Sequence, residues 1–325
     1  MFVNQKEGIS LKGIRLLTAK EQEENKEKWL EIKKNGIGGS EIAAIVGFSK
    51  WTSPYELWLE KTGVVEPEDK SDNEAVYWGT VQEETVAKEF AKRTGKKVRK
   101  QGIIQDEEVP YFLASVDRVI DGENAILECK TANAYAKDAW KDDNIPDNYY
   151  CQVQWYCGIT GADRAYIAVL IGGNHFVWKT VERNDNDIEQ LRKAGKDFWE
   201  KVQKNIVPEV DGSEACQQAL QQRYETSKPD TLIAFDSKAK EMFELYDRAC
   251  ALMDEAKQQK TLAENYFKNE LGENEAGEYM ERKVTWKPVK ARVSFNTESF
   301  KADHPDLYEK YNNKVGKATR QFKVK

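Results

Sequence analysis

Two short runs of apolar residues near the middle of the chain each end in charged side chains. The first covers residues 112–117 and ends in Asp117, and the second covers residues 125–130, with Glu128 and Lys130 near its end. The sequence Asp-Gly-Glu-Asn at positions 121–124 separates them and is rich in turn-forming residues. This pattern predicts a β-hairpin with a loop of about four residues.

The second strand of the expected hairpin carries its charges on one face. Side chains alternate along a strand, so Ile126, Glu128 and Lys130 share one face, and Leu127 and Cys129 share the other. A carboxylate and an ammonium group on a buried strand are unfavourable unless they meet each other, a metal ion or a substrate.

Asp117, placed across the hairpin, would bring a second carboxylate to the same spot. Mg²⁺ prefers oxygen ligands, here Asp117, Glu128, the backbone carbonyl of Cys129 and water. The ion would lower the pKa of a bound water, and Lys130 would position that water or offset charge on a phosphate. The pattern suits Mg²⁺-dependent phosphodiester hydrolysis, but it is short, and a hairpin with solvated charges fits it equally well.

The composition favours a soluble globular protein. The 325 residues suffice for one large domain or two ordinary ones, and they are 40% hydrophobic and 33% charged. No apolar run approaches the length of a membrane span, and residues 1–12 are too polar for a secretory signal. We therefore expect a cytoplasmic protein without a membrane partner.

Cysteine and histidine are poor candidates for chemistry here. The five cysteines form no C-x-x-C motif, and the two histidines, His175 and His304, lie far apart in the sequence. Carboxylates must therefore hold any metal ion. The net charge of −6 does not exclude a nucleic-acid partner, because binding needs only a local basic surface. The clusters at 96–100 and 33–34 are candidates, although each is also typical of a solvated face.

The remaining patterns predict an α/β (α+β) fold with a mixed sheet flanked by helices. Expected helices cover residues 21–34, 40–46 with Ser40 as N-cap, 53–62, 81–94 with Glu83 in the first turn, 149–160 and 185–204. Expected strands cover residues 98–104, 164–171 and 174–181. Residues 132–142 are expected to be helical or loop.

The character of the sequence changes at residues 208–213, which divides the chain into domains 1–208 and 209–325. Residues 237–271 carry apolar side chains at heptad spacing, which predicts a helix of about 50 Å. That helix could self-associate as a coiled coil, form a helical hairpin or pack along the first domain. A small β-hairpin at 281–295, a helix at 297–311 and a strand-like tail at 319–325 are expected after it.

Four motifs in a fixed order add a resemblance to this picture. They are Trp29 with Lys33 and Gly36–Ala43, then Gly79–Glu83, then Ser115-x-Asp117 with Glu128-Cys129-Lys130, and finally Tyr149–Gln154. Together they resemble the YqaJ-type viral recombinases, relatives of lambda exonuclease in the PD-(D/E)xK nuclease superfamily. The resemblance covers residues 25–175 and implies a core like that of restriction endonucleases.

The resemblance also implies an activity. Such enzymes degrade linear double-stranded DNA from 5′ ends in the 5′→3′ direction, with two Mg²⁺ ions per active site, which Mn²⁺ can replace. They form rings, trimeric in lambda exonuclease, and pass the exposed 3′ strand to a single-strand annealing protein. A phage or prophage origin is implied as well.

By position in the motifs, five side chains would form the active site. Asp117 and Glu128 would bind metal with the Cys129 carbonyl, Glu83 would bind a second ion, and Lys130 would act on the water. Gln152 would touch the scissile phosphate or order Lys130.

The resemblance further implies a pocket for the terminal 5′-phosphate, formed by Lys33, Ser40 and Ser115, with Tyr149 also at the DNA. The family usually has arginine where this chain has Lys33, so the phosphate preference is expected to be looser. Lys34 is the alternative if the register differs by one residue.

Two other functions are compatible with these motifs. One is a structure- or site-specific endonuclease on the same core. The other is a DNA-end-binding recombination scaffold without activity, in which the long C-terminal helix is the working part. The intact set of Glu83, Asp117, Glu128 and Lys130 favours an enzyme.

Overall fold

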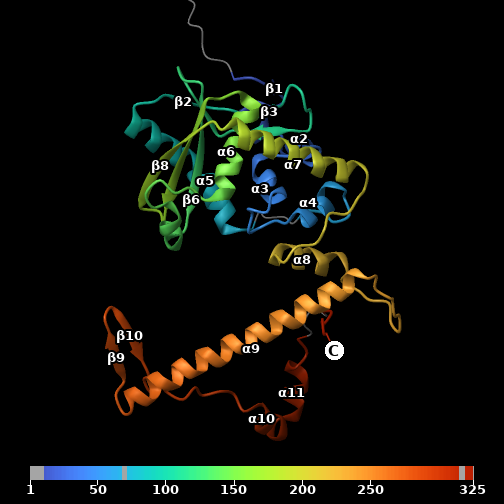
Figure 1. Ribbon diagram of the computed structural model, residues 1–325, viewed down its shortest axis with the longest axis vertical. Helices are drawn as coiled ribbons and strands as arrows, with labels where there is room; N and C mark the ends of the chain where they lie inside the picture. The colour runs from blue at the N-terminus through green and yellow to red at the C-terminus, as the bar shows by residue number, and fades with distance from the viewer. Residues whose placement is uncertain (1–10, 68–71, 315–318, 325) are drawn as a thin grey trace, which may run out of the picture. The chain divides into compact units, whose positions relative to one another are not determined.

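The computed structural model describes residues 11–67, 72–314 and 319–324 of the chain (Figure 1). It consists of two compact units, residues 1–225 and 226–325. Each unit is described separately below.

The first unit alternates helices and strands. Its helices are α1 (Ala19–Glu24), α2 (Lys26–Lys34), α3 (Gly39–Ile45), α4 (Pro54–Lys61), α5 (Glu74–Thr94), the 3₁₀ helix η1 (Ala134–Trp140), α6 (Asp147–Thr160), α7 (Asp185–Gln203) and α8 (Glu214–Arg223). Its strands are β1 (Ile14–Arg15), β2 (Val98–Lys100), β3 (Ile103–Gln105), β4 (Leu113–Ser115), β5 (Arg118–Ile120), β6 (Ala125–Ala132), β7 (Arg164–Ile171) and β8 (His175–Glu182).

A mixed five-stranded sheet in the order β2-β5-β6-β7-β8 forms the centre of this unit. Strands β6 and β7 are parallel, and the other neighbours are antiparallel. Helix α5 packs on one face through Phe90, which lies against Leu127 and Ala168 in one hydrophobic cluster. Helix α6 packs on the other face, and α3 and α7 pack against α6 (Figure 1). Ile126 and Ile167 belong to the hydrophobic cluster on this side. The expected fold, a mixed sheet flanked by helices, is confirmed.

The hairpin expected between residues 112–117 and 125–130 is wrong in its pairing. Instead, β2 pairs with β5 and β3 pairs with β4, both antiparallel and in one continuous register. Val98 lies opposite Ile120, and Ile103 lies opposite Ser115. This ribbon is interrupted at residues 101–102 and 116–117, and only β5 pairs with β6. The apolar run at 112–117 could pair with a strand before it or after it in the sequence. In the structure its partner is the upstream strand β3.

The turn at residues 121–124 does connect β5 to β6. Gly122 has a φ of 84°, a value that favours glycine, because a Cβ atom is disfavoured there. The expected strand at 98–104 is likewise divided, at Gly102. A Cβ atom on Gly102 would lie 2.0 Å from the backbone oxygen of Leu17, so only glycine fits at this point.

Capping side chains change two of the expected helices. Asn25 accepts a hydrogen bond from the Lys28 N–H at 3.0 Å and divides the helix expected at 21–34 into α1 and α2. Asn73 accepts from Ala75 N–H at 3.0 Å, so α5 begins at Glu74 and Glu83 lies within the helix, not in its first turn.

The expectation that Ser40 caps a helix is also wrong. Helix α3 begins one residue earlier, with Gly38 as N-cap, and Ser40 is exposed at its second position. The Glu41 side chain takes over the capping role, because its Oε2 accepts the Gly38 N–H at 2.7 Å.

Helix α8 belongs to the first unit, which therefore extends past the boundary expected at residue 208. It packs on α4 through Cys216 and Ala219, both of which are buried. Arg223 Nη1 also donates to Tyr55 Oη at 2.7 Å.

The second unit contains the long helix α9 (Lys238–Leu271), as expected. The hairpin of β9 (Ala276–Tyr279) and β10 (Arg282–Thr285) lies earlier than the expected 281–295, because the chain turns at Met280 with a φ of 53°. The helix expected at 297–311 is divided into α10 (Thr297–Asp303) and α11 (Pro305–Tyr311), since proline disfavours helical backbone in the preceding residue. Residues 319–324 form no strand, contrary to expectation.

Among the described residues, no helix combines the length and the apolar character that crossing a membrane requires.

The close approach at Gly102 gives a test of this fold. We expect Gly102→Ala to lower the free energy of unfolding by about 1–3 kcal/mol, because the new Cβ would collide with rigid backbone at Leu17. Urea denaturation followed by tryptophan fluorescence measures the change. Gly212→Ala is the matched control, since nothing lies within 4 Å of a Cβ there. Equal unfolding free energies for the two variants would contradict the described packing.

Candidate active site

A buried carboxylate on β6 forms the centre of the site. Glu128 is 3% exposed, and its Oε1 accepts hydrogen bonds from Lys130 Nζ at 2.7 Å and from Gln152 Nε2 at 2.6 Å. Its second oxygen, Oε2, is buried but has no hydrogen-bond partner among the described residues. A buried carboxylate oxygen without a partner is unfavourable, so this atom needs a cation or a donor that the protein itself does not supply.

Asp117 lies next to this centre, at the interruption between β4 and β5. Its Oδ2 accepts the backbone N–H of Cys129 at 2.7 Å, so the side chain reaches β6 from outside the paired strands. Burial raises the pKa of Asp117 well above its usual value, and the nearby charges of Glu128 and Glu83 raise it further.

The same crowding acts on Glu128 and Lys130. Burial raises the pKa of Glu128, and the Lys130 ammonium offsets part of that increase. Burial alone would lower the pKa of Lys130, but Glu128 and then Asp117 outweigh it, so the pKa is raised and the ammonium stays charged. One cation thus faces two carboxyl groups, and their raised pKa values reflect the cost of ionising both of them there without a further cation.

Gln152 on α6 fixes the orientation of both charged partners. Its Oε1 accepts from Lys130 Nζ at 3.1 Å, while its Nε2 donates to Glu128 and, at 3.1 Å, to Tyr156 Oη. Lys130 Nζ also lies 5.0 Å from the centre of the Tyr149 ring. The structure therefore brings together Glu128, Lys130, Gln152 and Tyr149 as the sequence motifs suggested.

Glu83 does not join the other two carboxylates directly. Its Oε1 accepts from Arg118 Nη1 at 2.6 Å, and Arg118 Nη2 donates to the neighbouring Glu84 at 2.8 Å. Arg118 is 3% exposed and also donates to the carbonyl of Asp117 at 2.7 Å. Sequence reasoning missed Arg118, although an arginine at the start of a buried strand is a signal for a carboxylate partner.

No three carboxylate, cysteine or histidine side chains in the described part of the chain are grouped closely enough to hold a metal ion by themselves. Mg²⁺ does not need such a group, because it commonly binds one or two carboxylates and completes its shell with water and substrate phosphates. The unpartnered Oε2 of Glu128 beside Asp117 fits that requirement. The residues present therefore fit a Mg²⁺ ion.

Helix α3 begins directly beside this centre. A Cβ on Gly39 would lie 2.6 Å from Tyr156 Cε1 and 2.7 Å from Gln152 Cγ, so glycine lets α3 approach α6 closely. Ser40 follows it and is exposed. Ser115 is partly buried on β4, two residues before Asp117.

Lys33 lies at the end of α2, with its Nζ 5.2 Å from the centre of the Trp29 ring. Burial alone would raise the pKa of Glu41, but Lys61 and then Lys33 outweigh it and lower the pKa, which places both lysines near this α3 carboxylate. Lys61 Nζ donates to Glu41 Oε1 at 2.7 Å and to the Lys33 carbonyl at 2.6 Å. Sequence reasoning did not single out Lys61 or Glu41. Lys34, the alternative to Lys33, is exposed.

Comparison with known proteins agrees with the resemblance in the motifs. Residues 28–163 match the model of the YqaJ-like viral recombinase domain. The chain is 42% identical over 313 residues to the uncharacterized protein YqaJ of Bacillus subtilis (strain 168), covering 94% of this chain and 96% of that protein.

Two solved structures are also similar. The alkaline exonuclease LHK-Exo of Laribacter hongkongensis is 20% identical, with a TM-score of 0.49, over 55% of this chain and 94% of that one. A phage-related exonuclease of Haemophilus somnus 129PT is 13% identical, with a TM-score of 0.40, over 53% of this chain and 96% of that one. Because the identity to the Bacillus subtilis protein extends over nearly the whole chain, the chain belongs to the YqaJ-like viral recombinase family.

Proposed function

We propose that this protein is a Mg²⁺-dependent exonuclease that degrades linear double-stranded DNA in the 5′→3′ direction and leaves 3′ single strands for annealing recombination. The observation that carries the proposal is the carboxylate of Glu128, whose Oε1 accepts from a charged Lys130 while its buried Oε2, beside Asp117, has no partner among the described residues. This combination suits hydrolysis of a phosphodiester, and membership of a viral recombinase family supports DNA as the substrate.

The residues divide the work as follows. Asp117, Glu128 and the Cys129 carbonyl would hold Mg²⁺, which when bound supplies charge stabilisation at the phosphate and an activated water. Lys130 is held by Glu128 and Gln152 at a fixed position, so its ammonium can orient the attacking water or offset charge that develops on the phosphate.

The 5′-phosphate end would bind near the start of α3. Lys33 supplies a positive charge there, Ser40 an exposed hydroxyl, and Ser115 and Tyr149 border the centre from β4 and α6. A lysine ammonium is a point charge and not a bidentate fork, so the preference for a 5′-phosphate over a 5′-hydroxyl should be modest.

Activity tests the central assignment. We expect Lys130→Ala and Asp117→Asn each to reduce cleavage of linear duplex DNA by at least about 10²-fold, since one removes the ammonium and the other a charged ligand. Release of acid-soluble nucleotides measures the rate, and circular dichroism verifies folding. Lys196→Ala, an exposed lysine on α7, is the control that should leave the rate unchanged. Activity near that of the control in either site variant would exclude the proposed centre.

We propose that Glu83 binds a second metal ion. For this its carboxylate must release Arg118 and contact the metal. We expect Glu83→Gln to reduce the number of Mn²⁺ ions bound per chain from two to one, as counted by titration calorimetry. Glu84→Gln is the matched control, because Glu84 also pairs with Arg118 from the same helix but has no proposed metal role. Two ions bound by Glu83→Gln, or the same loss in both variants, would remove Glu83 from the ligand set.

We also propose that the protein acts as an oligomeric ring, with a trimer favoured, and that it delivers the 3′ strand to a single-strand annealing protein. Helix α9 supports self-association, because its heptad positions Met242, Leu245 and Leu252 are all exposed.

Solution mass tests the role of α9. Replacing Leu245 and Leu252 together by glutamine should shift the mass measured by light scattering toward that of a single chain, because both seam positions lose apolar contact. Phe243→Gln changes an exposed apolar residue outside the seam and should leave the mass unchanged. A double variant with the mass of the unmodified protein would show that α9 does not assemble the oligomer.

A further inference from the structure

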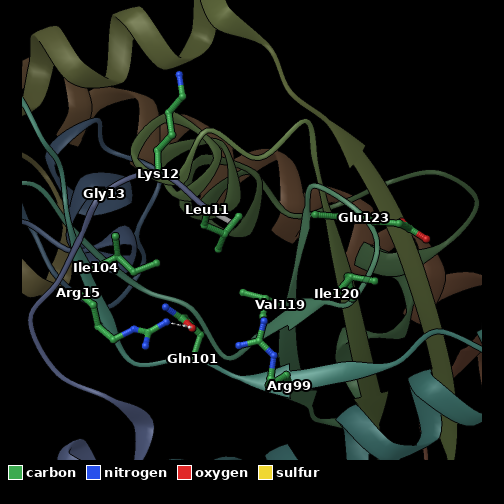
Figure 2. Close-up of a pocket in the computed structure, with 11 residues that line it drawn as sticks. Leu11, Lys12, Gly13, Arg15, Arg99, Gln101, Ile104, Val119, Ile120 and Glu123 are labelled. Carbon is green, nitrogen blue, oxygen red and sulfur yellow. Dashed lines mark hydrogen bonds between the residues drawn. The ribbon is translucent and has the colours of Figure 1, made fainter. Parts of the chain in front are cut away.

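A pocket of about 330 Å³ lies at the edge of the five-stranded sheet, apart from the carboxylate centre (Figure 2). One wall comes from residues 11–15, at and before β1, and the other from β2, β5 and the interruption of the ribbon at Gln101. The pocket shares no residue with the proposed catalytic set.

Two arginines converge on this pocket from different segments. Figure 2 shows the guanidinium groups of Arg15 and Arg99 directed toward one another, with the Gln101 side chain between them. Arg15 Nη2 donates to Gln101 Oε1 at 3.5 Å, and Arg15 pairs with no carboxylate of the described residues. Both arginines are exposed, so solvent screens their repulsion, and an anion between them would be attracted by both.

The acidic residues near the pocket each have partners, and only Asp121 pairs with one of the two arginines. Glu123 points its carboxylate away from the two guanidinium groups and binds Lys96 Nζ and, at 3.0 Å, Tyr166 Oη. Asp121 accepts only from Nε of Arg99, at 3.2 Å, which leaves the two terminal nitrogens of that guanidinium available. Glu107 also lies at this wall, where its Oε1 accepts the Gly13 N–H at 3.1 Å, so the positive charge of the pocket comes from Arg15 and from the terminal nitrogens of Arg99.

The rest of the lining suits an organic anion. Lys12 adds a third cation at the rim, where Figure 2 shows its ammonium pointing away from the arginines. Leu11, Ile104 and Val119 supply apolar walls. The volume of the pocket is at the lower end of the range of about 300–1,000 Å³ that is typical of small-molecule pockets. The pocket is therefore larger than a phosphate group alone requires.

We propose that this pocket binds the phosphate of a nucleotide between Arg15 and Arg99, with the attached sugar against the apolar wall. Arginine forks match phosphate oxygens in geometry and charge. The phosphate comes from one of two sources with the same chemistry, a nucleoside 5′-monophosphate or the backbone of a DNA strand. The proposal does not depend on nuclease activity, because it uses neither the carboxylates nor a metal ion.

Titration calorimetry in EDTA tests this site without catalysis. The probes are inorganic phosphate, deoxyadenosine 5′-monophosphate and a ten-residue oligothymidylate with hydroxyl groups at both ends. Replacing Arg15 and Arg99 together by alanine should weaken binding of at least one probe about tenfold or more, because charge-assisted hydrogen bonds are lost. Arg164→Ala, which removes a surface arginine paired with Glu182 at 3.6 Å, is the matched control.

The pattern across the probes identifies the source. A loss confined to phosphate and the mononucleotide assigns the pocket to phosphomonoesters, and a loss that includes the oligothymidylate assigns it to the DNA backbone. Arg99→Gln guards against a folding artefact, because it keeps a polar group in place of a side chain that is 58% exposed. This variant should also weaken binding. Absence of binding by the unmodified protein, or equal isotherms for it, the double variant and Arg164→Ala, would overturn the proposal.

Discussion

The buried carboxylate of Glu128 is the constraint on which the rest of the site depends. A charge that is only 3% exposed is unfavourable unless ionic and hydrogen-bonding partners surround it. Those partners come from Lys130 on the same strand and Gln152 on α6, so α6 must pack against this face of the sheet. Gly39 then lets α3 approach α6 closely. The positions of one strand and two helices follow from the need to satisfy one charge.

The pairs β2–β5 and β3–β4 form one antiparallel ribbon, which is interrupted at residues 101–102 and 116–117. This interruption has two consequences. It places Asp117 where its carboxylate reaches the Cys129 N–H on β6. It also separates the five-stranded sheet from a three-stranded sheet in the order β1-β3-β4 and leaves the pocket between Arg15 and Arg99. Gln101 takes part in both, because its backbone N–H donates to the Asp117 carbonyl and its side chain contacts Arg15.

Features that depend only on neighbouring residues, such as the face of a strand or the end of a helix, were predicted from the sequence. The two-residue period placed Glu128 and Lys130 on one face of β6, and the structure has them hydrogen-bonded there. The expected ends of the helices at residues 94 and 160 are confirmed, and Gly95 and Gly161, which follow them, adopt left-handed backbone. Neither inference needed information about distant parts of the chain.

Non-local choices were not predictable in this way. The run at 112–117 had apolar candidates on both sides, and its pairing with residues 103–105 depends on the whole sheet. Glu83 was expected in a first turn because the helix was expected to begin at residue 81, whereas its N-cap, Asn73, lies upstream. Arg118 was missed because its partners, Glu83 and Glu84, are 35 and 34 residues away in sequence.

Digestion of three DNA substrates tests the central claim most directly. Two are linear duplexes labelled at the 3′ ends, one with 5′-phosphates and one with 5′-hydroxyls, and the third is a closed circle, each with Mg²⁺ and with EDTA. The proposed function predicts loss of each strand from its 5′ end, somewhat faster with phosphate, dependent on metal and absent on the circle. Cleavage of the circle would contradict an end-dependent exonuclease and favour an endonuclease, and no cleavage of any substrate would contradict a nuclease function for this chain.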